Sequence, residues 1–265
     1  MNGLSVAEIL QVADRIFPFN QAEPWDNCGL QIGNLERTVD AVAFSLDPSF
    51  KAIEFAAGHS CSLLVTHHPV LLEPVRNLVS ADYSSAILIA AVRAQVDIMS
   101  LHTNLDAAPG GLNDHLAETI GLQDTMVPLR ASCARFGRLP IPVPVYELAS
   151  RLADTLNCSC PRIVADGNRL VESVFCASGS GMGYWSEALR CRADVVVTGD
   201  IRYHAAVEAF EKGIALIDAG HFALEKAAPL IMGVAFEREF ELMGREITCH
   251  ICELEKDPFL DIYHL

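Results

Sequence analysis

Basic residues are scarce in this chain of 265 residues. It has 19 Lys and Arg against 34 Asp and Glu, which gives a net charge of −15. Proteins that bind nucleic acid or anionic membranes need clustered Lys and Arg. We therefore expect no nucleic-acid partner and no membrane surface, whereas the negative charge is compatible with a cation-binding site.

Long apolar runs are also absent. Runs such as 86–92 and 195–197 are far too short to cross a bilayer. The first residues, Met1 to Ser5, have neither the basic segment nor the apolar core of an export signal, so we expect a protein of the cytoplasm. Because 51% of the residues are apolar, the chain can bury a substantial core as one large α/β domain or two small ones.

A second pair of cysteines separated by two residues, which a structural zinc site would need, is missing as well. Nine cysteines in a chain without an export signal are expected to be reduced thiols, many of them small packing residues. Cys249 and Cys252 alone have the two-residue gap of a metal or redox pair, since Cys158 and Cys160 are separated by one residue. The 249–252 stretch alternates like a strand, so we favour packing over chemistry for these thiols.

The sequence does contain a repeated alternation of apolar, strand-like segments with amphipathic helices. A first helix begins at the capping box Ser5 to Glu8 and ends before Pro18. Further strands are expected at 38–46, 62–66, 96–101, 171–177, 193–197 and 214–217, and further helices at 48–57, 83–95, 112–120, 146–156, 184–190 and 221–236. This order predicts an α/β protein of layered sheets with flanking helices.

Residues 130–160 form the least regular part of the chain. Prolines at 140, 142, 144 and 161 bracket its single expected helix. We interpret the segment as a short connector between two halves, about 1–130 and 160–265, of one domain that spans the whole chain.

Two adjacent histidines follow one of the expected strands. The apolar run 63–65 leads into Thr66-His67-His68-Pro69, and the proline prevents the strand from continuing. Neighbouring side chains alternate faces inside a strand but need not do so at its end, so both imidazoles can serve one site. The alternative interpretation is a polar surface turn.

The next strand ends in His102-Thr103-Asn104-Leu105-Asp106. Loops that follow successive parallel strands gather at one edge of a sheet, so we expect Asp106 to lie near His67 and His68. Asp106 can also be read as a turn residue. His102 is a candidate for proton transfer or for supporting hydrogen bonds.

The last buried strand leads into a helix that carries His221 and Glu225. Four residues separate them, so they project from one face of the helix and can share a cation. An ordinary exposed helical pair is the alternative. Asp200, which follows the preceding strand, and His204, one turn into the next helix, are further candidates for proton transfer, with structural hydrogen bonding as the default for each.

A glycine-rich turn at 179–183 precedes another helix. Such a turn can present backbone N–H groups to an anion. It lacks both the lysine of a phosphate-binding loop and the glycine spacing of a dinucleotide site, so we favour a tight structural turn.

Five candidate ligands therefore follow strands or begin helices: His67, His68, Asp106, His221 and Glu225. Adjacent histidines cannot easily bind one ion, so a two-ion centre with a bridging carboxylate is the natural geometry. Nitrogen and oxygen donors without a thiolate suit Zn, Fe, Mn, Co or Ni. Two ions roughly 3.5–4 Å apart can lower the pKa of a shared water toward neutrality and polarise a carbonyl, amidine or phosphoryl group, which is hydrolytic chemistry.

Four motifs in order, at 25–30, 66–69, 102–106 and 220–225, closely resemble those of the NIF-three-like proteins, catalogued as GTP cyclohydrolase type-two homologues. The resemblance implies a compact form of that fold, without the middle domain that longer relatives insert, and a toroidal homohexamer whose sites face an internal cavity. It also implies that His67 and Glu225 bind one ion, with His221 beside His67, and that His68, Asp106 and Glu225 bind the other.

The two-ion centre predicts a metal-dependent hydrolase acting on a cyclic amidine, an amide or a phosphoester. The family's catalogue description implies a GTP cyclohydrolase as one such enzyme. The chain has no evident basic cluster for a triphosphate, and Arg202 is the nearest candidate. Two alternatives remain open, a non-catalytic protein that binds or delivers metal and an interaction scaffold that metal stabilises.

Overall fold

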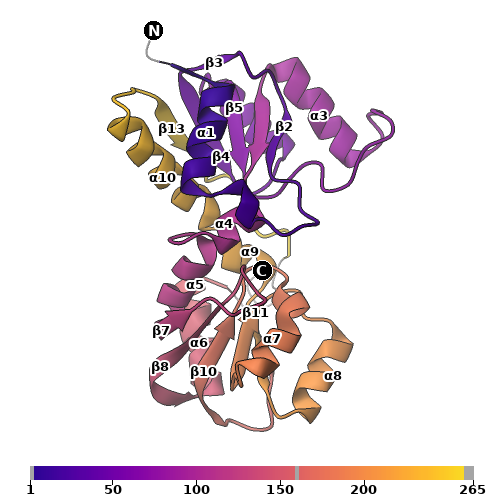
Figure 1. Cartoon of the computed structure of the whole chain (residues 1–265). Helices are drawn as coiled ribbons and strands as arrows, with labels where there is room; N and C mark the ends of the chain where they lie inside the picture. Colours follow the sequence, from indigo (N-terminus) through magenta and orange to yellow (C-terminus); the bar gives the residue numbers. More distant parts are fainter. Residues whose placement is uncertain (1–2, 159–160, 260–265) are drawn as a thin grey trace. The chain divides into compact units, whose positions relative to one another are not determined.

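The computed structural model describes residues 3–158 and 161–259. The chain forms two compact units, each with its own sheet and helices (Figure 1). The first unit comprises 1–108 and 227–255, and the second comprises 109–226 and 256–265. These boundaries differ from those of the expected halves because a C-terminal helix and strand return to the first unit. That the two units make one domain stays a prediction.

The first unit is built on a five-stranded sheet in the order β13-β4-β5-β6-β2. Strands β13, β4, β5 and β6 are parallel, and β2 runs antiparallel to β6. The strands are β2 (Gly29–Ile32), β4 (Ala41–Ser45), β5 (Leu63–Thr66), β6 (Asp97–Ser100) and β13 (Thr248–Ile251), with a separate small pair, β1 (Leu4–Ser5) and β3 (Thr38–Val39). The helices are α1 (Val6–Ile16), the short η1 (Phe19–Gln21), α2 (Phe50–Gly58), α3 (Tyr83–Ala94), α4 (Thr103–Ala107) and α10 (Ala228–Leu242).

Alternation along β4 shows how this sheet is covered on both faces. Ala43 packs in a cluster with Ala56 of α2 and Ile87 of α3. The next residue, Phe44, faces the other way and meets Phe236 of α10, with ring centroids 5.3 Å apart. Because both faces are buried, the central strands are almost wholly apolar, and this makes them visible in the sequence.

The expected capping box is present at the start of α1. Ser5 Oγ accepts a hydrogen bond from Glu8 N at 3.2 Å, and the Glu8 carboxylate accepts one from Ser5 N at 2.7 Å. The pairing satisfies two backbone donors that a helix start otherwise leaves without partners.

The second unit is built on a six-stranded sheet in the order β7-β8-β10-β11-β12-β9. Strands β10, β11 and β12 are parallel, and the others run antiparallel to their neighbours. The strands are β7 (Gln123–Met126), β8 (Arg135–Pro144), β9 (Arg162–Val164), β10 (Leu170–Cys176), β11 (Val195–Thr198) and β12 (Ala215–Asp218). The helices are α5 (Leu112–Ile120), α6 (Val145–Leu156), the short η2 (Gly181–Tyr184), α7 (Trp185–Arg190), α8 (Tyr203–Glu211) and α9 (His221–Glu225).

The segment expected to be a connector is part of the second unit's sheet and core. It supplies β8 and α6, and Leu148 and Leu152 of α6 are buried in the core cluster. Pro140 and Pro142 lie where the register of β8 against β10 shifts, so their missing N–H groups remove no hydrogen bond from regular pairing. The prolines interrupt the regular pairing of β8 with β10, and for this reason the sequence of β8 resembles that of a loop.

The expected helix at 221–236 is two helices. α9 ends at Glu225 and α10 begins at Ala228. Pro229 lies in the first turn of α10, where its missing N–H and fixed φ suit a helix start but not a helix interior. The break leaves His221 and Glu225 on a short helix of their own.

The α/β class with layered sheets and flanking helices is confirmed, and so is the strand expected at 249–252, which is β13. Among the described residues no helix is long and apolar enough to cross a membrane. Ser159 and Cys160 lie outside the described residues, so the spacing interpretation for Cys158 and Cys160 rests on the sequence alone.

Candidate metal site

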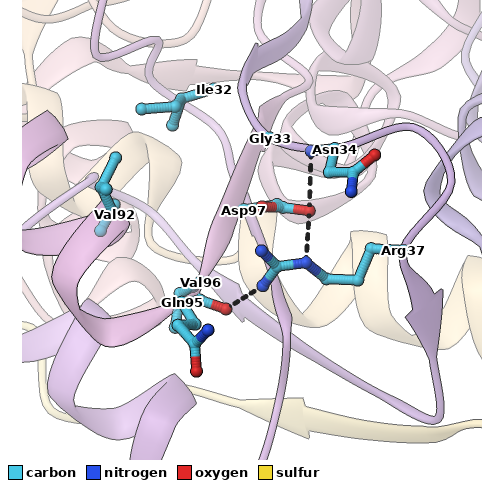
Figure 2. A pocket seen from close by; sticks show the side chains of 9 residues that line it. Ile32, Gly33, Asn34, Arg37, Val92, Gln95, Val96 and Asp97 are labelled. Atoms are coloured by element: carbon cyan, nitrogen blue, oxygen red, sulfur yellow. Dashed lines mark hydrogen bonds and ion pairs between the residues drawn. The ribbon is translucent and has the colours of Figure 1, made fainter.

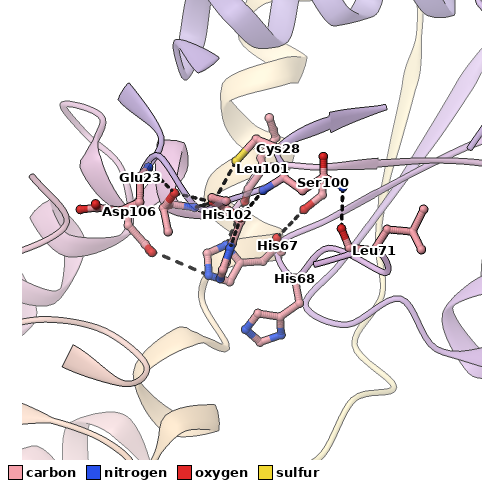
Figure 3. Close-up of polar contacts among 12 residues, drawn as sticks. Glu23, Cys28, His67, His68, Leu71, Ser100, Leu101, His102 and Asp106 are labelled. Carbon is pink, nitrogen blue, oxygen red and sulfur yellow. Dashed lines mark hydrogen bonds and ion pairs between the residues drawn. The ribbon is translucent and has the colours of Figure 1, made fainter. Parts of the chain in front are cut away.

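Three histidines lie together at the C-terminal ends of β5 and β6 in the first unit. His67 and His68 follow β5 directly, and His102 follows β6 by one residue (Figure 3). The ring centroids lie 5.0 Å apart for His67 and His68, 5.1 Å for His67 and His102, and 5.6 Å for His68 and His102. One nitrogen of each ring lies within 4.8 Å of the others. The three imidazoles can therefore offer nitrogens to a metal.

Asp106 lies in the same place. Its Oδ1 atom is 3.9 Å from His67 Nε2, and both side chains are almost completely buried. Helix α4 starts immediately after His102, and this short helix brings the Asp106 carboxylate back beside His67. Asp106 can thus share an ion with His67. The pairing with His68 that the resemblance implies stays a prediction.

Hydrogen bonds to Nδ1 fix the orientation of the two adjacent rings. His67 Nδ1 lies 2.9 Å from the Leu101 carbonyl oxygen, and His68 Nδ1 lies 2.7 Å from Asp47 Oδ1. A carbonyl or carboxylate oxygen can only accept, so each Nδ1 carries the proton and each Nε2 keeps the lone pair that binds a metal. This arrangement is typical of histidines that act as metal ligands.

Asp26 holds His102 in the same way. His102 Nδ1 lies 2.9 Å from Asp26 Oδ1, while Thr103 N donates to Oδ2 at 3.0 Å and the Thr103 hydroxyl also donates to Oδ2. Burial alone would raise the pKa of Asp26, but the hydrogen bonds and His102 outweigh it and hold that pKa well below its usual range. The carboxylate therefore stays charged and fixes the orientation of the His102 ring.

The loop that carries Asp26 also brings Trp25 and Cys28 to the site. The Trp25 side chain is 59% exposed and meets His102 edge-on at a centroid distance of 6.0 Å. Burial and the nearby Asp26 charge raise the pKa of the Cys28 thiol to about 12, and its Sγ donates to Asp26 Oδ2 at 3.1 Å. The thiol is thus protonated at neutral pH and offers no thiolate ligand.

The second unit carries His221 and Glu225. His221 Nε2 lies 2.8 Å from Glu225 Oε2, and the Glu225 side chain is buried. His221 Nδ1 lies 2.8 Å from Asp200 Oδ2, so this ring too has its Nδ1 engaged by an acceptor. Asp200 has a left-handed backbone with φ of 54°, which directs its carboxylate from the end of β11 toward the start of α9.

Two glycines make room for this pair. A Cβ at Gly179 would collide with Glu225 Oε1, and Gly179 also has a left-handed φ of 56°. A Cβ at Gly199 would lie 2.8 Å from the backbone nitrogen of His221. The glycine turn therefore packs against the candidate ligands, in keeping with the structural role that we favour from the sequence.

His204 and Arg202 lie on the exposed side of α8 and its start. The His204 ring contacts that of Tyr203 at a centroid distance of 5.4 Å. In the part of the chain that the structure describes, no hydrogen bond or ion pair joins His204 to His221 or Glu225. Its role in proton transfer stays a prediction.

A small cavity of about 190 Å³ lies at the opposite end of the first unit's sheet (Figure 2). Arg37 forms an ion pair with Asp97 at 3.3 Å there and donates to the Gln95 carbonyl oxygen at the end of α3. Asn34 N donates to the same carboxylate at 3.2 Å. These contacts tie β2 to β6 and α3, and none of the candidate ligands lines the cavity.

The donor types in each unit suit a divalent cation. They are imidazole nitrogens and carboxylate oxygens, and four imidazoles have Nδ1 held by an acceptor. Sequence reasoning found the donors but missed Asp26 and Asp47, because they come from loops far away in the chain and no local spacing links them to the histidines.

Comparison with known proteins finds relatives that match this chain over almost its full length. The family model Duf34/NIF3 (NGG1p interacting factor 3) matches residues 4–258. A "GTP cyclohydrolase 1 type 2 homolog" of Clostridium acetobutylicum is 27% identical over 263 residues, which cover 97% of this chain and 98% of the relative. A protein of the same description from Methanocaldococcus jannaschii is 30% identical over 226 residues, covering 84% of this chain and 90% of the relative.

A solved structure supports the fold. The crystal structure of a Bacillus cereus protein related to NIF3 superposes with a TM-score of 0.91 at 20% identity, covering 99% of this chain and 100% of that one. The resemblance that the four motifs indicate is thereby confirmed, and the chain belongs to the Duf34/NIF3 family.

Proposed function

We propose that this protein binds two divalent metal ions per chain and acts as a metal-dependent hydrolase. The observation that carries the proposal is the shared arrangement of His67, His68, His102 and His221. Each ring has Nδ1 on a backbone carbonyl or a carboxylate, which places the lone pair of His67, His68 and His102 on Nε2. His221 Nε2 lies 2.8 Å from Glu225 Oε2, a carboxylate that could share a cation with it. Such preorganisation exceeds what a polar surface turn needs.

In this proposal the first unit supplies His67, His68 and Asp106, and the second supplies His221 and Glu225. Adjacent histidines would serve two ions more easily than one, and Glu225 has two carboxylate oxygens with which it could serve both. Mixed nitrogen and oxygen donors suit Zn, Fe, Mn, Co or Ni. When bound, two such ions would lower the pKa of a shared water and polarise the bond to be cleaved.

His102 is the residue that we propose for proton transfer. Its Nδ1 is fixed by an ionised Asp26, so its free nitrogen belongs to the cluster formed with His67 and His68. The hydrogen bonds from Thr103 hold Asp26 in turn, and the ring therefore keeps one tautomer and one direction. His204 remains a second candidate on sequence grounds alone.

The substrate class that we propose is a small molecule with a cyclic amidine, an amide or a phosphoester. The relatives' description as GTP cyclohydrolase homologues supports the amidine. Arg202, exposed at the start of α8, would supply one positive charge for the phosphates of such a substrate. From the resemblance we also propose a toroidal homohexamer.

We propose the cytoplasm as the location. Among the described residues no two cysteines form a disulfide, as expected in a reducing compartment.

The test combines an activity panel with elemental analysis of the purified protein. We expect two metals per chain and metal-dependent turnover of a nucleotide, a pterin or a phosphodiester. His68→Ala and Glu225→Ala should abolish turnover, while His115→Ala, which removes an exposed imidazole from α5, should not change it. Two bound metals without turnover on any substrate would favour a metal-binding or delivery protein instead. Dissociation of an oligomer by a chelator would favour the scaffold.

A further inference from the structure

The last residues of the first unit return to the strand end that carries Asp47. After β13, Cys252 N donates to the Phe44 carbonyl oxygen at 2.8 Å, so the chain continues alongside β4. Three residues later the Glu255 carboxylate accepts two hydrogen bonds. Its Oε2 atom accepts from Leu46 N and its Oε1 atom accepts from Asp47 N, each at 2.7 Å.

These two backbone groups belong to the turn on which His68 rests. His68 N donates to the Leu46 carbonyl oxygen at 3.0 Å, and His68 Nδ1 lies 2.7 Å from Asp47 Oδ1. Ser45 Oγ donates to the Asp47 carbonyl oxygen at 2.7 Å and holds the turn from the other side. The backbone and the ring of His68 therefore both depend on residues that Glu255 clamps.

The Asp47 side chain cannot supply this order by itself. It is 53% exposed, and an exposed carboxylate loses much of its attraction for a partner to solvent and to rotamer freedom. Two charge-assisted hydrogen bonds to consecutive N–H groups fix the backbone from which the side chain extends. The two hydrogen bonds to Glu255 thus help to set the direction in which the Asp47 side chain extends.

We propose that Glu255 is a positioning residue for the metal-binding nitrogen of His68, acting through the backbone and side chain of Asp47. The inference rests on the proposed function only in taking His68 as a ligand of a divalent cation. It makes the C-terminal segment of the first unit part of the metal site, although that segment contains none of the ligands.

The first test uses the full-length chain without metal and reads the ring protons directly. A histidine Nδ1–H bonded to a carboxylate gives a slowly exchanging, downfield proton in nitrogen-correlated NMR spectra, and the His68 signal is the one that His68→Ala removes. We expect Glu255→Gln to lose or broaden it, because the amide has one acceptor oxygen and turns a donor toward the second N–H group. Glu253→Gln, which removes an equal charge from an exposed side chain two residues earlier, should leave it unchanged.

The second test measures zinc affinity by competition with a chromophoric chelator. Loss of a residue that orients a metal ligand typically weakens metal binding about 10–100-fold. We therefore expect Glu255→Gln to lower the affinity for one of the two zinc ions by that factor. Asp47→Asn should give the same loss, and the double variant should be no weaker than Asp47→Asn alone. Glu253→Gln should bind both ions as the unmodified chain does.

The outcomes separate this inference from the function on which it rests. An unmodified chain that takes up no zinc would defeat the proposed function, and the NMR comparison would still decide the role of Glu255. An unchanged His68 signal in Glu255→Gln, or fully additive losses in the double variant, would overturn the positioning role even if two metals bind. Because Asp47 is largely exposed, Asp47→Asn is expected to fold and keeps the test informative if Glu255→Gln does not.

Discussion

The two units hold their candidate ligands by different means. In the first unit, three imidazoles follow strand ends, and the hydrogen bonds that their Nδ1 atoms donate to Leu101, Asp47 and Asp26 set their directions. In the second unit, one imidazole and one carboxylate share a short helix, and the close approach of two glycines leaves room for them. The ligands of the first unit depend on hydrogen bonds that orient their rings, and those of the second depend on space beside the glycines. Substitutions in the two units should therefore disturb metal binding in different ways.

Gly179→Ala should have the largest effect, because it removes space in the second unit. The new Cβ would collide with Glu225 and force a side chain into a left-handed backbone. We expect the free energy of unfolding to fall by about 2–4 kcal/mol, and metal content to fall with it. Denaturant titration and elemental analysis measure both quantities.

Gly183→Ala is the matched control, since a Cβ there meets nothing within 4 Å. If both variants were equally stable and equally loaded with metal, the argument from space would be wrong.

Asp26→Asn should disturb the first unit by removing orientation rather than space. The amide has one acceptor oxygen for donors from His102 and Thr103, so we expect a loss of about 1–3 kcal/mol in stability and a changed His102 tautomer. Nitrogen-correlated NMR of the ring reports the tautomer. Asp154→Asn, an exposed position on α6, controls for the change in charge, and an unaltered His102 spectrum in Asp26→Asn would contradict this role for Asp26.

Asp194 offers a pH-dependent test of the second unit away from the metal ligands. Burial raises its pKa, but hydrogen bonds from Ser173 N, Ser173 Oγ and Glu172 N outweigh this and hold the pKa below its ordinary value. The unfolded chain then binds more protons in acid, so this stabilisation is present at neutral pH and is lost as pH falls below about 4.

We expect Asp194→Asn to be about 1–2 kcal/mol less stable than the unmodified chain at pH 7, with a difference that shrinks on acidification. Denaturant titrations across the acid range give that difference. A gap between the two proteins that stays constant with pH would show that the Asp194 charge is not what stabilises the start of β11.

Cys28→Ala should have the smallest effect. Its thiol has a pKa raised to about 12 and offers no ligand at neutral pH, so both metals should remain bound. Stability should change by about 1 kcal/mol or less for the lost hydrogen bond to Asp26. Loss of one metal ion in this variant would contradict a site without thiolates.

The sequence predicts those parts of the fold that carry strong local patterns. Strands β4, β5, β6, β11 and β12 are buried on both faces and are largely apolar, the last four residues of β10 are also buried, and the capping box marks the start of α1. Strands such as β7 and β8 escape prediction because β7 is exposed and β8 contains prolines. The break between α9 and α10 was missed although Pro229 marks it, because the apolar spacing continues across it.

The same distinction applies to the candidate site. His67, His68, Asp106, His221 and Glu225 are visible because each follows a strand or begins a helix at a spacing that suits a ligand. The roles of Asp26, Asp47 and Glu255 are not visible, although Asp26 lies in the motif at 25–30, because they come from tertiary contacts with residues 76, 21 and 208 positions away. The sequence indicates a glycine-rich turn that includes Gly179, but the close approach of Gly179 to Glu225 follows only from the fold.

Anomalous diffraction from zinc-loaded crystals tests the central claim most directly, because it locates each ion independently of activity. We expect two peaks about 3.5–4 Å apart, each contacted by side chains from the proposed ligand set of His67, His68, Asp106, His221 and Glu225. Histidine nitrogens should lie about 2.0–2.1 Å from the ions. A single peak, or peaks that none of these side chains contacts, would contradict the account.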